Sequence, residues 1–152
     1  MSLYLVRHAK AGNRSEWQGD DRIRPLTPKG WRQAEAIAAR LAPLRPTVLR
    51  SSTYVRCRQT LEPLGALVGL DVVDEPALVE GNPFEPVLHL LATLPDGAVL
   101  CSHGDVIPDT LAALERRGCR FAGPVEWRKG SVWTLERVGD DIVAAEMWLP
   151  TD

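Results

Sequence analysis

Five polar side chains spread along this chain could together handle a phosphate group: Arg7, His8, Arg56, Glu80 and His103. Guanidinium groups match phosphate oxygens with paired hydrogen bonds and keep their charge. A neutral imidazole is a competent nucleophile toward phosphorus, and positive charge around it lowers its pKa. In this interpretation His8 attacks phosphorus, Arg7, Arg56 and His103 stabilise the phosphoryl oxygens, and Glu80 protonates the leaving oxygen.

A metal site is the alternative chemistry for the same residues. His8, His103 and Glu80 form a ligand set known from hydrolytic metal sites. Arg7 and Arg56 argue against it, because two guanidinium groups would repel a dication, whereas phosphoryl transfer without a metal needs them. We therefore expect no metal and no cofactor. A cysteine nucleophile finds no support either, since no cysteine is followed by arginine six positions later.

The elements that must position these side chains follow from apolar periodicity and from capping and turn signals. The predicted strands are residues 3–6, 47–51, 72–73 and 98–102, with a closing hairpin of residues 131–136 and 142–149. The predicted helices run from the Thr27-Pro28 cap to Leu41, from the hydroxyl-rich residues 51–53 to Val68, and over residues 87–94 and 105–118. Pro63 lies inside the second helix and is expected to divide it into two pieces, with Arg56 in the first.

Strand and helix alternate four times, which predicts an α/β fold: a three-layer α/β/α sandwich with a mainly parallel central sheet. Ligands bind at the carboxyl ends of the strands in such sheets. Arg7 and His8 follow the first strand, Arg56 opens the helix after the second, Glu80 follows the third and His103 the fourth. All five are therefore expected at one edge of the sheet.

Length and composition limit the classes of protein to which this chain can belong. The 152 residues are expected to form one domain, residues 1–152. A net charge of −2 argues against a binder of nucleic acid polymers with a broad basic face, although it allows a local basic pocket. Three cysteines without a C-x-x-C pair favour a reducing compartment, and no apolar run has the length of a membrane span. We expect a cytoplasmic protein without membrane contacts; the sequence does not indicate its oligomeric state.

Residues 10–26 form a predicted loop that is unusually long, which suggests a functional role. Arg14 and Arg22 could extend a phosphate pocket outward or be solvated loop charges, and the second interpretation is favoured. Trp17 could stack on a substrate ring, but capping of the local core is favoured. The lone His89 lies among apolar residues of a predicted helix and is interpreted as structural.

Four motifs in order resemble the histidine phosphatase superfamily, also called phosphoglycerate-mutase-like. They are Leu5-Val6-Arg7-His8-Ala9, Arg24-Pro25-Leu26-Thr27 with Gly30 and Gln33-Ala34, Ser51-Ser52 with Arg56-Cys57 and Gln59-Thr60, and Ser102-His103-Gly104. The resemblance spans nearly the whole chain. The spacing is most similar to small SixA-type phosphohistidine phosphatases and to the phosphatase domain fused behind some actinobacterial Nudix hydrolases.

The resemblance implies roles for matching positions. The nucleophile of the family falls on His8, its phosphate-binding arginines on Arg7 and Arg56, and its second pocket histidine on His103. Further implied phosphate contacts are Arg24, in the Arg-Pro-Leu-Thr segment, and Gly104, after the second histidine. Glu80 falls near the general acid of the family, with Asp105 as a fallback. The third residue of the family's Arg-His-Gly signature is Ala9 here.

The expected function is phosphate hydrolysis through a phosphohistidine intermediate on His8. Only about twenty residues join the third and fourth strands, so the pocket should be open and shallow, which suits a phosphate displayed on a protein histidine. A SixA-type phosphohistidine phosphatase acting on a phosphoprotein is therefore placed first. The enzyme alternative, supported by Glu80, is a phosphatase of small phosphomonoesters or nucleotides. A catalytically silent phosphate-binding module is the alternative from another class; it would lack the nucleophile or an arginine, and neither is missing.

Overall fold

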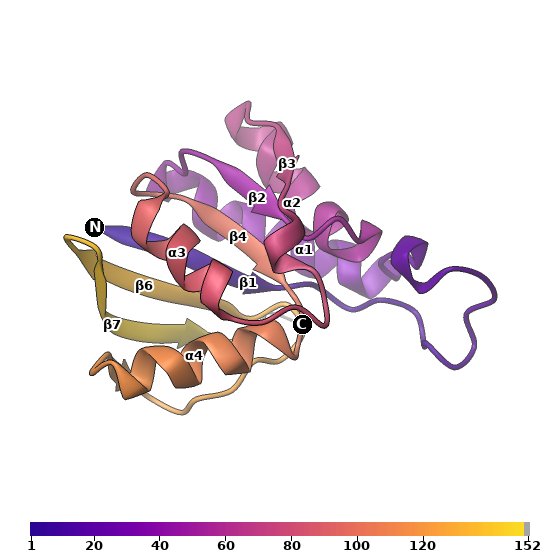
Figure 1. The fold of residues 1–152 in the computed structure, drawn as a ribbon. Coiled ribbons are helices and arrows are strands. Elements are labelled where there is room, and N and C mark those ends of the chain that lie inside the picture. Colours follow the sequence, from indigo (N-terminus) through magenta and orange to yellow (C-terminus); the bar gives the residue numbers. More distant parts are fainter. Residues whose placement is uncertain (151–152) are drawn as a thin grey trace.

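The computed structural model describes residues 1–150 and shows a central sheet with helices on both faces (Figure 1). The strands are β1 (Ser2–Arg7), β2 (Leu49–Ser51), β3 (Val72–Asp74), β4 (Val99–Ser102), β5 (Arg120–Ala122), β6 (Val132–Val138) and β7 (Asp141–Trp148). The α-helices are α1 (Pro28–Leu41), α2 (Val55–Val68), α3 (Glu85–Thr93) and α4 (Val106–Arg116). Three 3-10 turns are η1 (Asp21–Ile23), η2 (Ala42–Leu44) and η3 (Pro76–Leu78).

The sheet has the strand order β3-β2-β4-β1-β6-β7-β5. The β3, β2, β4 and β1 strands are parallel neighbours, while β6 runs antiparallel to both β1 and β7. The α/β class, the mainly parallel sheet and the closing hairpin are thus confirmed. The short edge strand β5, which pairs in parallel with β7, was not among the predicted strands. Its three residues are too few for a period-2 pattern to stand out.

Two apolar cores lie on opposite faces of the sheet, because successive strand residues point to opposite sides. Leu5 and Leu100 pack with α3 and α4 on one face, whereas Val6 and Cys101 pack with α1 and α2 on the other. This is the expected three-layer arrangement, with α1 and α2 behind the sheet and α3 and α4 in front in Figure 1. Buried strands β1 and β4 therefore hold the carboxyl edge of the sheet rigidly.

The first helix begins where the sequence predicts. Thr27 caps α1, its hydroxyl oxygen accepting a hydrogen bond from the backbone N–H of Gly30 at 3.1 Å, and Pro28 is the first helical residue. The prediction for α2 was wrong, because one continuous helix runs through Pro63. Fully buried Leu61 and Leu64 anchor the chain on both sides of the proline, so packing offsets the single backbone hydrogen bond that proline removes.

No helix among residues 1–150 combines the length and apolarity that crossing a membrane would require.

Candidate active site

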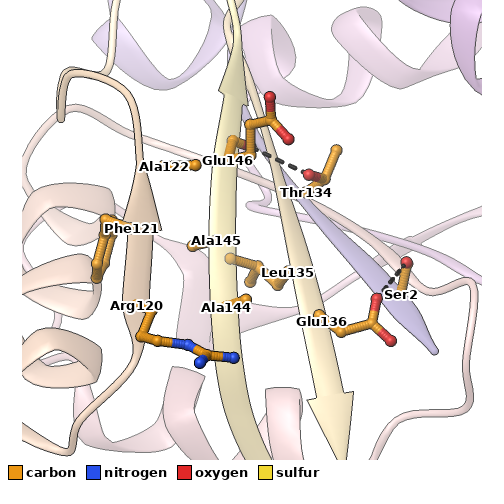
Figure 2. A pocket seen from close by; sticks show the side chains of 10 residues that line it. All are labelled: Ser2, Arg120, Phe121, Ala122, Thr134, Leu135, Glu136, Ala144, Ala145 and Glu146. Carbon is orange, nitrogen blue, oxygen red and sulfur yellow. Dashed lines mark hydrogen bonds between the residues drawn. The ribbon is translucent and has the colours of Figure 1, made fainter.

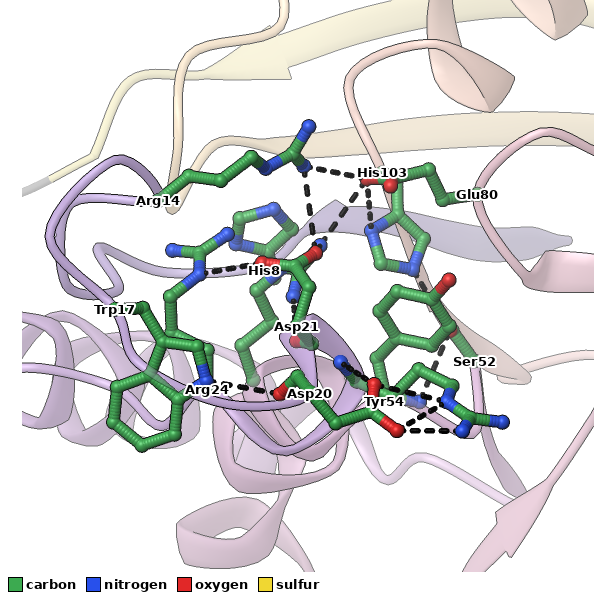
Figure 3. A network of polar contacts seen from close by, with 12 residues as sticks. His8, Arg14, Trp17, Asp20, Asp21, Arg24, Ser52, Tyr54, Glu80 and His103 are labelled. Atoms are coloured by element: carbon green, nitrogen blue, oxygen red, sulfur yellow. Dashed lines mark hydrogen bonds and ion pairs between the residues drawn. The ribbon is translucent and has the colours of Figure 1, made fainter.

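The carboxyl edge of the parallel strands brings the expected residues together, and Figure 3 shows three of them, His8, Glu80 and His103. The ring centroids of His8 and His103 lie 5.5 Å apart. Nη2 of Arg56 lies 3.1 Å from Oε1 of Glu80, and the same oxygen lies 3.7 Å from Nδ1 of His103. Arg7 reaches the group from β1, with its guanidinium against Gly104. The juxtaposition of side chains from four chain segments is therefore as the sequence predicts.

The orientation of His8 leaves one ring nitrogen able to attack. Its Nδ1 lies 2.9 Å from the carbonyl oxygen of Ala9, which can only accept, so Nδ1 carries the proton and Nε2 the lone pair. The backbone N–H of Ala9 in turn donates to Oγ1 of Thr60 on α2 at 2.9 Å. Burial holds the pKa of His8 well below its usual 6.5, and the positive charges of Arg7 and Arg56 lower this pKa further.

The second histidine, His103, has Nδ1 rather than Nε2 on the side of Glu80. Ser52 Oγ accepts a hydrogen bond from the backbone N–H of Tyr54, so its own hydrogen can be donated to Nε2 of His103, 2.8 Å away. When Nε2 accepts this hydrogen bond, the ring proton lies on Nδ1, on the side of Glu80. The thiol of Cys57 also lies 3.5 Å from Nε2, so α2 and the residue that follows β2 together fix this ring.

Both arginines are held by hydrogen bonds through Nη1, and in both the Nε–H has no partner in the part of the chain that the structure describes. Arg7 donates through Nη1 to the carbonyl oxygen of Trp127 at 3.0 Å, and Arg56 donates through Nη1 to the carbonyl oxygen of Asp21 at 2.9 Å. Among the buried side-chain nitrogens of residues 1–150, Nε of Arg7, Nε of Arg56 and Nδ1 of His103 have no hydrogen-bond partner. Buried donors without partners are costly, so three of them around one nucleophile indicate a site for an anion.

Gly104 has a specific steric reason to be glycine. A Cβ atom at this position would lie 2.6 Å from Cζ of Arg7, so a side chain here would push the guanidinium aside. Gly104 thus lets Arg7 lie across the start of α4. The implied phosphate contact at Gly104 is therefore placed beside the anion site, although its clearest effect is on the position of Arg7.

The loop before α1 supplies residues that the sequence did not single out. The Asp21 carboxylate accepts from Nη2 of Arg56 at 3.1 Å and from Nε of Arg24 at 2.8 Å, so it joins two arginines. Arg14 donates to Glu80 at 3.0 Å and lies 3.6 Å from Asp21. Arg14 thus lines the cleft beside His8, as the alternative interpretation expects, while its side chain stays 63% exposed to solvent. Arg22 pairs with its exposed neighbour Asp20, as a surface charge does.

Two carboxylates near the site differ in what they contact. Oε1 of Glu80 accepts from both Arg56 and Arg14 and lies within ion-pair distance of His103. Asp105 instead caps α4 by accepting from the backbone N–H of Val106 at 2.8 Å, and its second oxygen accepts from the N–H of Gly81 at 2.7 Å. Asp105 therefore ties the Glu80 turn to α4, and Glu80 remains the carboxyl group in contact with the pocket.

A cleft of about 520 Å³ opens beside these residues. Its charged lining comprises five basic side chains and one carboxylate: Arg7, Lys10, Arg14, Arg24, Lys129 and Glu80. Arg24 is thus in the cleft, as the resemblance implies, with its side chain buried. The excess of positive charge suits an anionic ligand. Within residues 1–150 no three His, Cys, Asp or Glu side chains are grouped closely enough to hold a metal ion.

A second hollow has the wrong charge for a phosphate. It measures about 380 Å³ and lies on the outer face of β5, β6 and β7 (Figure 2). Its lining includes Glu136 and Glu146 against the single base Arg120, and Ser2 donates to Glu136 at 3.2 Å. Two carboxylates on an open sheet face would repel an anion, so the cleft beside His8 is the candidate site.

The family is identified by a match over half of the chain. Residues 3–83 match the model of the histidine phosphatase superfamily, branch 1. This chain belongs to that superfamily. The resemblance to this superfamily is thereby confirmed; the matched region contains His8, Arg56 and Glu80, and the Ser102-His103-Gly104 motif lies beyond it.

Two kinds of protein among the known relatives are similar to this chain over nearly all of its length. This chain is 35% identical over 157 residues to the 8-oxo-(d)GTP phosphatase of Mycolicibacterium smegmatis; the match covers 99% of this chain and 49% of the relative. The chain therefore spans about half the length of that protein. Its fold is similar to that of SixA from Agrobacterium tumefaciens, with a TM-score of 0.77, 26% identity and coverage of 99% and 98%. SixA from Nakamurella multipartitia follows, with a TM-score of 0.67, 29% identity and coverage of 99% and 95%.

Proposed function

We propose that this protein hydrolyses phosphate groups on small phosphorylated molecules, nucleotides foremost, through a covalent phosphohistidine on His8. The observation that carries the chemistry is the convergence of unpartnered donors on Arg7, Arg56 and His103 around a neutral His8 ring. The 35% identity to an 8-oxo-(d)GTP phosphatase, over nearly all of this chain, supports a nucleotide substrate. This reverses the order expected from the sequence, which placed a phosphoprotein first.

The reaction would take place in two displacements. Nε2 of His8 forms a bond to phosphorus while the bond from phosphorus to the leaving oxygen breaks, and that oxygen takes the electron pair and a proton. Water then attacks phosphorus and returns one proton to the group that protonated the leaving oxygen. The N–P bond breaks, and Nε2 regains its lone pair as inorganic phosphate leaves. Arg7, Arg56 and the Nδ1–H of His103 would stabilise the charge on the phosphoryl oxygens in both steps.

Glu80 is the candidate proton donor because it is the carboxyl group that lines the cleft and because it lies beside His103. Its role depends on the leaving group: an alkoxide needs a proton more than a nitrophenolate or an imidazole does. Glu80→Gln should therefore reduce hydrolysis of alkyl phosphates much more than that of nitrophenyl phosphate. Equal losses for both substrates would remove Glu80 as the donor and leave it a partner of Arg56.

The test of the nucleophile compares two histidine variants. His8→Asn should reduce turnover of nucleotides and of nitrophenyl phosphate by about 1,000-fold or more, and should abolish an acid-labile phosphoryl label on the protein. His89→Asn is the matched control, because His89 is exposed on α3, outside the cleft, and should retain activity. Turnover that survives in His8→Asn would contradict the proposal.

A phosphoprotein remains the second candidate substrate, favoured by the structural likeness to SixA proteins. The cleft is bordered by exposed side chains of Lys10, Arg14 and Lys129, so its rim is accessible to a large partner. Turnover of a phosphohistidine-bearing protein would be measured beside a panel of nucleotides. A higher kcat/KM for the protein than for every nucleotide would reverse the preferred order.

A further inference from the structure

The cleft carries more positive charge than a single phosphoryl group uses. Within residues 1–150, Nε of Arg7 and Nε of Arg56 are donors without a partner. The guanidinium groups of Arg14 and Arg24, and Nη2 of Arg56, are already paired with Glu80 or Asp21. Lys10 and Lys129 line the same cleft. Within the part of the chain that the structure describes, neither lysine side chain has a carboxylate in ion-pair contact. Among the described residues, the ammonium groups of Lys10 and Lys129 thus have no carboxylate partner in the cleft that His8 also lines.

The backbone of Lys10 is fixed by the first turn of α1. Its N–H donates to Oε1 of Gln33 at 2.9 Å, and its carbonyl oxygen accepts from the N–H of Thr27 at 3.0 Å. Gly30 allows this close approach, since a Cβ there would lie 2.0 Å from the carbonyl oxygen of Lys10. Lys10 therefore extends from a rigid point two residues beyond the nucleophile.

The backbone around Lys129 is fixed to the same strand end. The N–H of Gly130 donates to the carbonyl oxygens of Arg7 and His8, at 3.2 and 3.1 Å. Gly130 has a φ of +83°, a conformation that L side chains rarely adopt, which explains a glycine at this close approach. Partial burial lowers the pKa of Lys129, and the positive charges of Arg7, Arg24, Arg56 and Lys10 lower it further, so its ammonium lies in their common field.

We infer that Lys10 and Lys129 form a subsite for a second phosphate group of the same substrate, so that the preferred substrates are phosphoanhydrides such as nucleoside di- or triphosphates. This inference rests on the proposed function and adds the class of bond that is cleaved. Ammonium groups are adaptable point charges that suit the non-bridging oxygens of a flexible polyphosphate.

The chemistry follows the two displacements given above. Nε2 of His8 attacks the terminal phosphorus, the bond to the bridging oxygen breaks, and the electron pair goes to the departing phosphate. Lys10 and Lys129 would neutralise charge on that departing phosphate, so protonation by Glu80 would matter less than for an alkoxide. Water then releases the terminal group from His8 as inorganic phosphate.

Binding of two inorganic probes tests the subsite without turnover. Calorimetry in EDTA-containing buffer would compare phosphate with methylenediphosphonate, whose bridge cannot be hydrolysed. We expect the native protein to bind methylenediphosphonate about tenfold or more tightly than phosphate, since each additional charge-assisted contact favours binding. The variant Lys10→Gln/Lys129→Gln should lose most of this preference and bind phosphate within about threefold of the native protein.

Arg117→Gln is a surface control that removes one positive charge outside the cleft, because Arg117 is exposed just beyond the C-terminal end of α4, opposite the end near His103. It should leave the preference unchanged. Equal binding of both probes by the native protein, or equal weakening of both in the lysine variant, would overturn the subsite. These results are separate from the nucleophile test: turnover that survives in His8→Asn would end the proposed function, whatever the lysines bind.

Discussion

The charge state of a single residue, His8, sets the pH range in which the proposed chemistry can work. Only the neutral ring has a lone pair on Nε2, and protonation removes it. Because burial and the neighbouring arginines lower the pKa of His8 well below 6.5, the ring should remain neutral as the pH falls through 6.5 and become protonated only at lower pH. Activity should therefore persist in mildly acidic solution.

Nitrogen NMR of the histidine rings measures this directly, with His8 assigned by the signal that His8→Asn removes. The expected result is a pair of neutral-ring signals for His8 at pH 6.5, with the Nδ1-protonated pattern that the contact to Ala9 requires. Protonation with a midpoint at or above pH 6.5 would contradict both the burial argument and the nucleophile assignment.

Gly104 offers a steric test at the same scale. In Gly104→Ala the new methyl group would meet the guanidinium of Arg7 and displace it. Loss of one aligned donor to a phosphoryl group should reduce kcat/KM roughly 10- to 100-fold, with little change in Tm. Gly12→Ala is the control, because a Cβ at position 12 has no atom within 4 Å. Similar kinetics for the two variants would mean that the position of Arg7 does not depend on Gly104.

At the scale of elements, the η1 turn within the loop of residues 10–26 holds the arginines of the site. Asp21 in this turn bridges Arg56 and Arg24, and Arg56 is buried. Asp21→Asn keeps the size of the side chain but removes the charge and one acceptor. We expect a fall in kcat/KM of about tenfold or more, since small displacements of positioning groups are costly.

The neighbouring carboxylate provides a matched control for this variant. Asp20 makes the same type of pair with Arg22, but both are exposed and outside the cleft, so Asp20→Asn should stay within about twofold of the native kcat/KM. A kinetic effect of Asp20→Asn equal to that of Asp21→Asn would indicate that the loop as a whole, rather than the Asp21 bridge, supports the site.

The contrast between η1 and the strands explains what the sequence could predict. His8 and His103 follow buried apolar runs, and the rule that parallel strands end at one edge suffices to bring them together. Asp21 and Lys129 lie on loops whose paths depend on tertiary hydrogen bonds, such as Gly130 to His8, which periodicity does not reveal. Pro63 misled the prediction for α2 because local propensity yields to packing in a buried helix.

At the scale of the whole molecule, the two cores share their strands, so we propose that residues 1–152 unfold as one domain. Leu5 and Val6 are neighbours in β1 but belong to opposite cores. Leu5→Ala and Leu61→Ala, one in each core, should each cost about 2–5 kcal/mol and lower Tm while far-UV circular dichroism and tryptophan fluorescence still change together. Separate transitions for the two probes would indicate independent units.

Charge distribution gives the other prediction for the whole molecule. The chain has a net charge of −2, yet the charged lining of the cleft is five basic groups against one carboxylate. Anionic substrates should therefore be attracted locally against a weakly repelling surface, and salt screens this attraction over about 10 Å at 0.1 M. We expect kcat/KM for a phosphorylated substrate to fall several-fold between about 20 and 300 mM KCl, while kcat changes little. In Lys10→Gln/Lys129→Gln the dependence of kcat/KM on salt should be weaker, whereas in Arg117→Gln it should be unchanged. If kcat/KM does not respond to salt, or responds equally in the native protein and both variants, electrostatic steering by the cleft is contradicted.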